Sequence, residues 1–127
     1  MKTLTRAEEQ VMQVLWGLPQ QKGFLKDVLD NSPEPRPHSN TVATLLKILI
    51  DKGFVDYEVQ GRNNLYRARV SKADYGRRSL QQLMKSYFEG SPARMVSQFL
   101  SDSKLSVEEL EALLKGIEAK RQQGNKG

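Results

Sequence analysis

The chain has 127 residues, 38% of them hydrophobic, a net charge of +5 and a mean hydropathy of −0.60. This length predicts one domain, or a small domain with an appended helical region. The lack of cysteine excludes disulfides and thiolate metal sites, and a single histidine argues against a transition-metal site. From these counts we expect neither a metal nor a cofactor. No run approaches the ~18 apolar residues of a membrane span, so we expect a cytoplasmic protein without membrane contact.

The positive charge is concentrated in one stretch. Residues 1–59 hold seven Lys and Arg against eight Asp and Glu, residues 60–94 hold eight against two, and residues 95–127 hold five against five. A polyanion suits such a patch, because neutralised phosphates release their counterions. The alternative is a basic surface that faces solvent and binds no polyanion.

The first 37 residues predict two helices and a loop. Thr5 and Glu8 have the spacing of a capping box, and apolar residues follow at helical spacing until Gly17 and Pro19 end the helix. A second, short helix is predicted over residues 23–31, followed by a proline-rich loop over residues 32–37.

Residues 39–70 predict an amphipathic helix followed by a basic hairpin. The helix covers residues 39–52 and ends at Gly53, and its apolar face consists of Val42, Leu45, Leu46 and Leu49. Two alternating segments, 54–59 and 65–70, flank turn residues 61–64. Helix, turn, helix, loop, helix and hairpin, in this order, are typical of a winged helix.

A winged helix of this kind predicts a DNA-contacting surface, because the recognition helix places its amino-terminal part in the major groove. Asn40 and Thr44 can hydrogen-bond base edges or phosphates, and Lys47 can reach guanine or a phosphate. The residues that we expect to contact DNA are Ser39, Asn40, Thr41, Ala43, Thr44 and Lys47 on the helix, and Arg62, Arg67 and Arg69 on the hairpin. A polar helix face on a protein-interaction module is the alternative.

The region from residue 71 onward predicts three amphipathic helices. The first helix runs to Glu89, and a break follows at residues 90–92. The second helix contains residues 95–100, and the third begins at Ser106, with a disordered tail from about residue 121. Their apolar residues predict a dimerisation module: Leu80, Leu83, Met84, Tyr87, Phe88, Met95, Val96, Phe99, Leu100, Leu110, Leu113, Leu114 and Ile117. A monomer that folds these helices back on the first domain is the alternative.

A series of short motifs extends along nearly the whole chain: Leu4-Thr5-Arg6-Ala7-Glu8-Glu9, Val11-Met12, Leu15-Trp16, Thr41-Val42, Leu45-Leu46, Lys52-Gly53, Gly61-Arg62, Tyr66, Tyr87-Phe88-Glu89-Gly90, the segment 96–100 and Leu105-Ser106-Val107-Glu108-Glu109-Leu110. In their order and spacing these motifs resemble the penicillinase-repressor family of bacterial winged-helix proteins. The resemblance implies a homodimeric repressor that binds a palindromic operator in double-stranded DNA.

The resemblance also distinguishes two ways of releasing DNA. Copper-responsive members use a cysteine-rich site, which this chain lacks, whereas antibiotic-responsive members are cleaved by a protease in the dimerisation region. Their cleaved Asn-Phe bond aligns with Gln98-Phe99, which implies a regulatory protease as a partner. Ile48 and Asp51 stand where those members carry arginine and lysine, so the resemblance implies a less positive recognition helix.

We therefore predict a mainly α fold with a small β-hairpin wing, divided into a winged helix-turn-helix domain at residues 1–70 and a helical dimerisation region at residues 71–127. The predicted function is sequence-specific DNA binding by a homodimeric repressor. A winged-helix protein-interaction module is the rival. We expect no enzyme, because the sequence has no phosphate-cradling glycine loop and no metal-ligand spacing.

Overall fold

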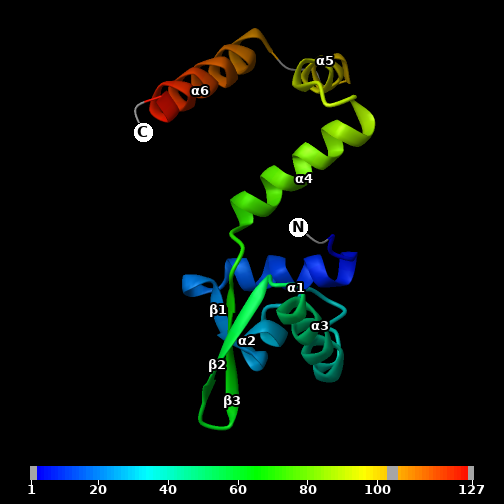
Figure 1. The fold of residues 1–127 in the computed structure, drawn as a ribbon, viewed down its shortest axis with the longest axis vertical. Coiled ribbons are helices and arrows are strands. Elements are labelled where there is room, and N and C mark those ends of the chain that lie inside the picture. The colour runs from blue at the N-terminus through cyan, green and yellow to red at the C-terminus, as the bar shows by residue number, and fades with distance from the viewer. Residues whose placement is uncertain (1–2, 103–105, 126–127) are drawn as a thin grey trace. The chain divides into compact units, whose positions relative to one another are not determined.

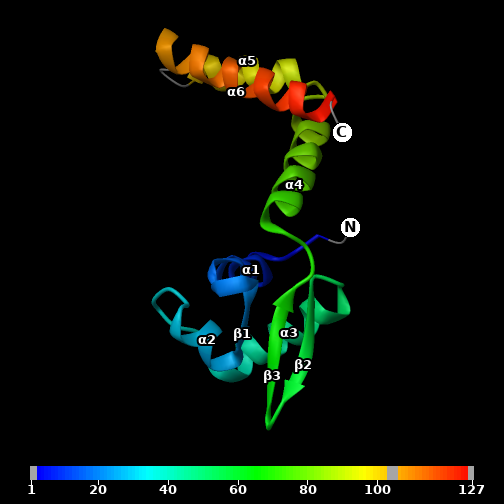
Figure 2. The same cartoon turned by 90° about the vertical axis from the view of Figure 1, so that its left-hand side faces the viewer.

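The computed structural model describes residues 3–102 and 106–125. The chain divides into a first unit that ends at Ser79 and a second that begins at Leu80. The first unit contains α1 (Arg6–Gly17), the 3-10 turn η1 (Pro19–Gln21), β1 (Lys22–Phe24), α2 (Leu25–Asp30), α3 (Ser39–Asp51), β2 (Val55–Gln60) and β3 (Asn63–Ala68) (Figures 1 and 2). Helix α4 (Lys72–Tyr87) spans the boundary, and the second unit also holds α5 (Pro92–Asp102) and α6 (Val107–Asn125).

The predicted fold class, mainly helical with a small wing, is confirmed. The hairpin of β2 and β3, with its turn at Gly61 and Arg62, is the wing. Gly61 has a φ of 64°, in the left-handed region that favours glycine. The capping box of α1 is also present: the Thr5 Oγ1 accepts from the Glu8 N–H at 3.2 Å, and a Glu8 carboxylate oxygen accepts from the Thr5 N–H at 3.0 Å.

The segment before α2 differs from its prediction as a helix from residue 23. Lys22–Phe24 form a strand that pairs antiparallel with β3, so the sheet has three strands in the order β1-β3-β2. Gly23 is buried, and a Cβ at this position would lie only 2.6 Å from a Leu18 methyl carbon. A strand of three residues is too short to show alternation, which is why the pattern did not reveal it.

Other element ends also shift. Asn63 and Asn64 belong to β3, so the wing turn is shorter than predicted. Helix α4 ends at Tyr87, two residues early, and α6 continues to Asn125, where the sequence predicts a disordered tail from about residue 121.

The core of the first unit lies where α1, α2 and α3 pack against the sheet. Three residues of α3, Val42, Leu46 and Leu49, are fully buried, and each burial contributes about 1.5–3 kcal/mol. The buried apolar residues are Leu4, Val11, Met12, Leu15, Trp16, Leu18, Val28, Val42, Leu46, Leu49, Phe54 and Val55. This core holds α3 by one face and leaves the other face exposed.

The start of α4 is fixed to this core. The Tyr75 ring lies 5.7 Å from the Trp16 ring and 5.8 Å from the Phe54 ring, the latter edge to face. The Trp16 Nε1–H donates to the Val70 carbonyl at 2.9 Å, just before α4. The first turns of α4 therefore belong to the first unit, although the sequence predicts a boundary at residue 70. Within residues 3–102 and 106–125, no helix is long and apolar enough to cross a membrane.

Candidate nucleic-acid interface

The outward face of α3 carries the polar residues that the sequence predicts for DNA contact. Ser39, Asn40, Thr41, Thr44 and Lys47 are exposed, and Ala43 is half-buried. The Thr44 hydroxyl donates to the Asn40 carbonyl at 2.9 Å, so its oxygen remains an acceptor while its proton is engaged. The helix thus presents an amide, a hydroxyl oxygen and an ammonium group along one face.

Both ends of α3 are defined by backbone geometry. The amino-terminal cap residue is His38, and no side chain in the described part of the chain caps the first turn, whose backbone N–H groups point out of the helix end. At the other end, Gly53 has a φ of 83° and the Phe54 N–H donates to the Leu49 carbonyl at 2.9 Å. The chain then enters β2 directly, which places the wing beside α3.

The three wing arginines differ in their surroundings. Arg62 lies in the turn and Arg69 follows the end of β3; both are exposed. Arg67 is exposed too, but its Nε donates to a carboxylate oxygen of Asp56 at 3.1 Å on the neighbouring strand. Hydrogen bonding to Asp56, together with the negative charge of Asp56, raises the pKa of Arg67. The positive charge of Arg67 is therefore partly offset by the negative charge of Asp56, whereas Arg62 is the cation at the tip of the wing.

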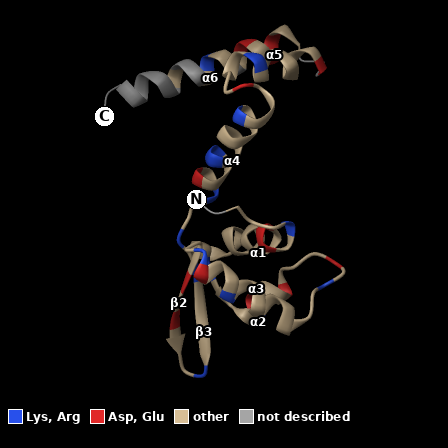
Figure 3. Cartoon of the chain, turned by 45° about the vertical axis from the view of Figure 1, so that its right-hand side comes forward, with Lys and Arg blue, Asp and Glu red and all other residues tan. Residues whose placement is uncertain are grey.

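The basic stretch predicted from residues 60–94 is compensated in part by local acids. Besides Arg67, Arg77 pairs with Asp74 at 3.0 Å and Arg94 pairs with Glu89 at 2.7 Å. Figure 3 shows acidic segments along β2 and a basic segment at the wing turn. A residue count could not reveal the Asp56 pair, because Asp56 lies in the acidic part of the sequence and meets Arg67 only through strand pairing.

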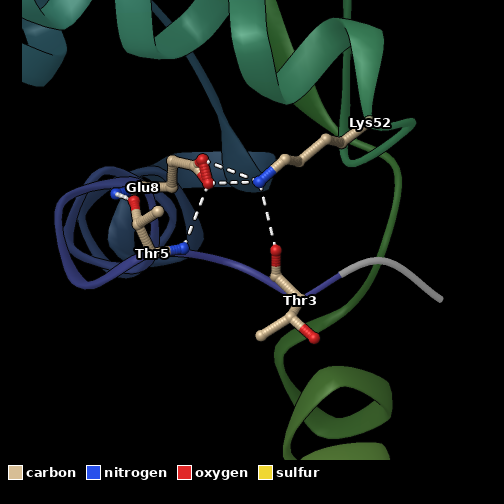
Figure 4. A network of polar contacts seen from close by, with 4 residues as sticks. All are labelled: Thr3, Thr5, Glu8 and Lys52. Atoms are coloured by element: carbon tan, nitrogen blue, oxygen red, sulfur yellow. Dashed lines mark hydrogen bonds and ion pairs between the residues drawn. The ribbon is translucent and has the colours of Figure 1, made fainter.

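A buried ion pair that the sequence reasoning missed joins α1 to the end of α3. The Glu8 side chain is almost fully buried, and the Lys52 ammonium donates to both of its carboxylate oxygens and to the Thr3 carbonyl at 3.1 Å (Figure 4). Burial alone would raise the pKa of Glu8, but hydrogen bonds from Lys52 and Thr5 and the charge of Lys52 lower it below its usual value.

One sequence signal could have located the buried carboxylate of this pair. Glu8 precedes the buried residues Val11 and Met12 by three and four positions, which places it on the core-facing side of α1. A carboxylate there needs a cation.

The helices from Leu80 onward expose many of their large apolar side chains. Among the described residues predicted to dimerise, Leu80, Leu83, Tyr87, Val96, Phe99 and Leu114 are exposed, and Met84, Phe88, Met95, Leu100 and Leu110 are half-buried. Tyr87 is 76% exposed and Phe99 56%. The side chains of Leu113 and Ile117 lie outside the described residues.

Comparisons with known proteins agree with this architecture. A family model described as "Penicillinase repressor" matches residues 4–119. The chain belongs to the penicillinase repressor family. A curated relative, the penicillinase repressor of Bacillus licheniformis, is 27% identical over 118 residues, which cover 91% of this chain and 89% of the relative. The resemblance seen in the sequence is thus confirmed, and the chain is a DNA-binding transcriptional regulator of the repressor type.

Proposed function

We propose that this member of the penicillinase repressor family is a homodimer that binds a two-fold-symmetric DNA operator. The main support for the proposal is the arrangement of α3, which buries its apolar face in the core and exposes Asn40, Thr44 and Lys47 on its other face. In this arrangement α3 enters the major groove and reads base edges, while Arg62 at the wing turn holds the sugar-phosphate backbone or the minor groove.

The dimer is proposed from the second unit. Exposed leucine, tyrosine and phenylalanine side chains on α4 and α5 are costly in water, and a second copy of the chain can bury them. When one of the two joined DNA-binding units has bound, the other is held close to its half-site. This high effective concentration raises the affinity of the dimer for DNA.

We further propose that a protease which cuts between Gln98 and Phe99 releases the repressor from DNA. This bond lies inside α5, where the Gln98 amide donates to Asp102 at 2.9 Å, so a protease reaches an extended substrate only when α5 opens locally.

The test of DNA binding is a salt titration with a fluorescent duplex. We expect the affinity to fall steeply, by about a thousandfold between 50 and 200 mM salt if six phosphates are neutralised. An affinity that hardly changes with salt would favour the rival function, a winged-helix module that binds protein.

The test of the dimer is sedimentation equilibrium of full-length variants. Leu83→Glu and Phe99→Glu place charges on the exposed apolar faces and should yield monomers, whereas Ser97→Glu changes an exposed polar residue of α5 and should leave the dimer intact. A wild-type monomer at micromolar concentration would contradict the proposal.

A further inference from the structure

A cleft of about 440 Å³ lies between the start of α2 and the wing turn. It exists because β1 pairs with β3: Phe24 stands opposite Leu65, so α2 begins beside the wing. The residues that line the cleft include Phe24, Lys26, Asp27, Arg62, Asn63 and Asn64. Sequence reasoning assigned only Arg62 among them, since the strand that creates the cleft was not predicted.

The lining of the cleft suits an anion of low charge. Lys26 from α2 and Arg62 from the turn are both exposed, and neither takes part in an ion pair within the described part of the chain. The Asp27 carboxylate also lines the cleft, where one oxygen accepts from the Phe24 N–H at 2.8 Å. The two cations and one carboxylate leave a net charge of about +1, and the Asn63 and Asn64 amides add neutral donors.

The cleft lies at the end of the first unit where DNA is expected. Strand β2 leaves the carboxyl end of α3 and runs to the wing turn, so the turn lies toward the amino-terminal end of α3 (Figures 1 and 2). In a helix-turn-helix the first of the two helices crosses the sugar-phosphate backbone while the second enters the groove. Here α2 and α3 take those places.

We propose that this cleft holds one phosphodiester of the operator backbone between Lys26 and Arg62. A single phosphodiester carries one negative charge, which matches the net charge of the lining, and the guanidinium of Arg62 can donate two hydrogen bonds to it. The proposal rests on the proposed DNA-binding function and adds a second element, α2, to its contacts with phosphate. Lys26 and Arg62 then act as one clamp and not as two separate contacts.

A double-mutant cycle tests whether the two cations share a phosphate. Lys26→Gln and Arg62→Gln should each lower the affinity for every duplex by a similar factor, on the order of three- to tenfold, and reduce the salt slope. The double variant should lose at least about twofold less than the product of the single losses, because the second change acts on a clamp already broken.

The matched control combines Lys26→Gln with Arg69→Gln. Arg69 is an exposed cation that follows the end of β3, whereas Arg62 precedes its start. These two changes should multiply without coupling. If the affinity losses of Lys26→Gln and Arg62→Gln also multiply without coupling, the clamp is rejected. It is rejected too if Lys26→Gln leaves the affinity unchanged.

A scan of single methylphosphonates along a bound duplex locates the phosphate. In each half-site, one methylphosphonate should lower the affinity of wild-type protein without lowering that of Lys26→Gln or Arg62→Gln. If the two variants are insensitive to methylphosphonates at different positions, the clamp is rejected while DNA binding stands. If wild-type protein binds no duplex in a salt-dependent manner, the proposed function itself fails.

Discussion

At the scale of single residues, Glu8 and Lys52 form a buried ion pair that contributes to stability. The Lys52 side chain is 22% exposed and that of Glu8 only 3%, so removal of the lysine leaves a carboxylate buried without its cation. We expect Lys52→Met to lower the free energy of unfolding by about 3–5 kcal/mol, measured by urea denaturation at pH 7. The double variant Glu8→Met with Lys52→Met should recover most of this loss.

The control for this prediction is an exposed pair. Arg36 and Glu34 are joined at 3.4 Å with side chains 52% and 80% exposed, so Arg36→Gln should cost less than about 0.5 kcal/mol. If Lys52→Met and Arg36→Gln lower the free energy of unfolding equally, the buried pair contributes no more to stability than the exposed pair.

The same pair predicts a pH dependence. The folded pKa of Glu8 is lowered, so its contribution is complete above the unfolded value of about 4.3 and is lost as the pH falls through the folded pKa. Wild-type protein should therefore lose stability between pH 5 and 3 faster than Glu8→Gln does, measured by urea denaturation at each pH. Parallel curves for the two proteins would contradict the lowered pKa.

At the scale of elements, α3 and the wing should separate specificity from affinity. Lys47→Ala should change which duplex variants are preferred, at a cost of about 1–3 kcal/mol if a base contact is lost. Arg62→Ala should weaken binding to all duplexes alike. Arg67→Ala should have a smaller effect than Arg62→Ala, because Asp56 already engages the Arg67 guanidinium.

Competition binding against a panel of single-base operator variants measures this difference. If Lys47→Ala and Arg62→Ala lower affinity by one common factor on every sequence, α3 does not read bases as proposed.

The elements also show what sequence can predict. The helices α1 and α3 were located correctly because helical spacing recurs over ten or more residues in each. The hairpin was located because two alternating segments flank turn residues. Strand β1 was missed because Lys22–Phe24 is held by pairing with β3, a contact made by distant residues. The Asp56–Arg67 pair, the Glu8–Lys52 pair and the Lys26 cleft were missed for the same reason: each forms only when separate elements meet.

At the scale of the whole molecule, integrity of α5 should control the joining of two DNA-binding units. A specific protease site engineered at residues 98–99, cut after folding, separates α6 from the rest of the chain. We expect the cut protein to dissociate to monomers and to lose operator affinity steeply. Sedimentation and anisotropy before and after cutting measure both effects, and uncut protein treated with inactive protease is the control. A cut protein that stays dimeric with unchanged affinity would reject this mechanism.

We propose above that two copies of this chain read one symmetric DNA site. The most direct measurement is selection of bound duplexes from a random library by the full-length protein at physiological salt. We expect an inverted repeat whose half-site centres lie one helical turn of DNA apart, ~34–36 Å, or a multiple of it. Selected duplexes with no shared sequence, or with a single unrepeated half-site, would contradict it.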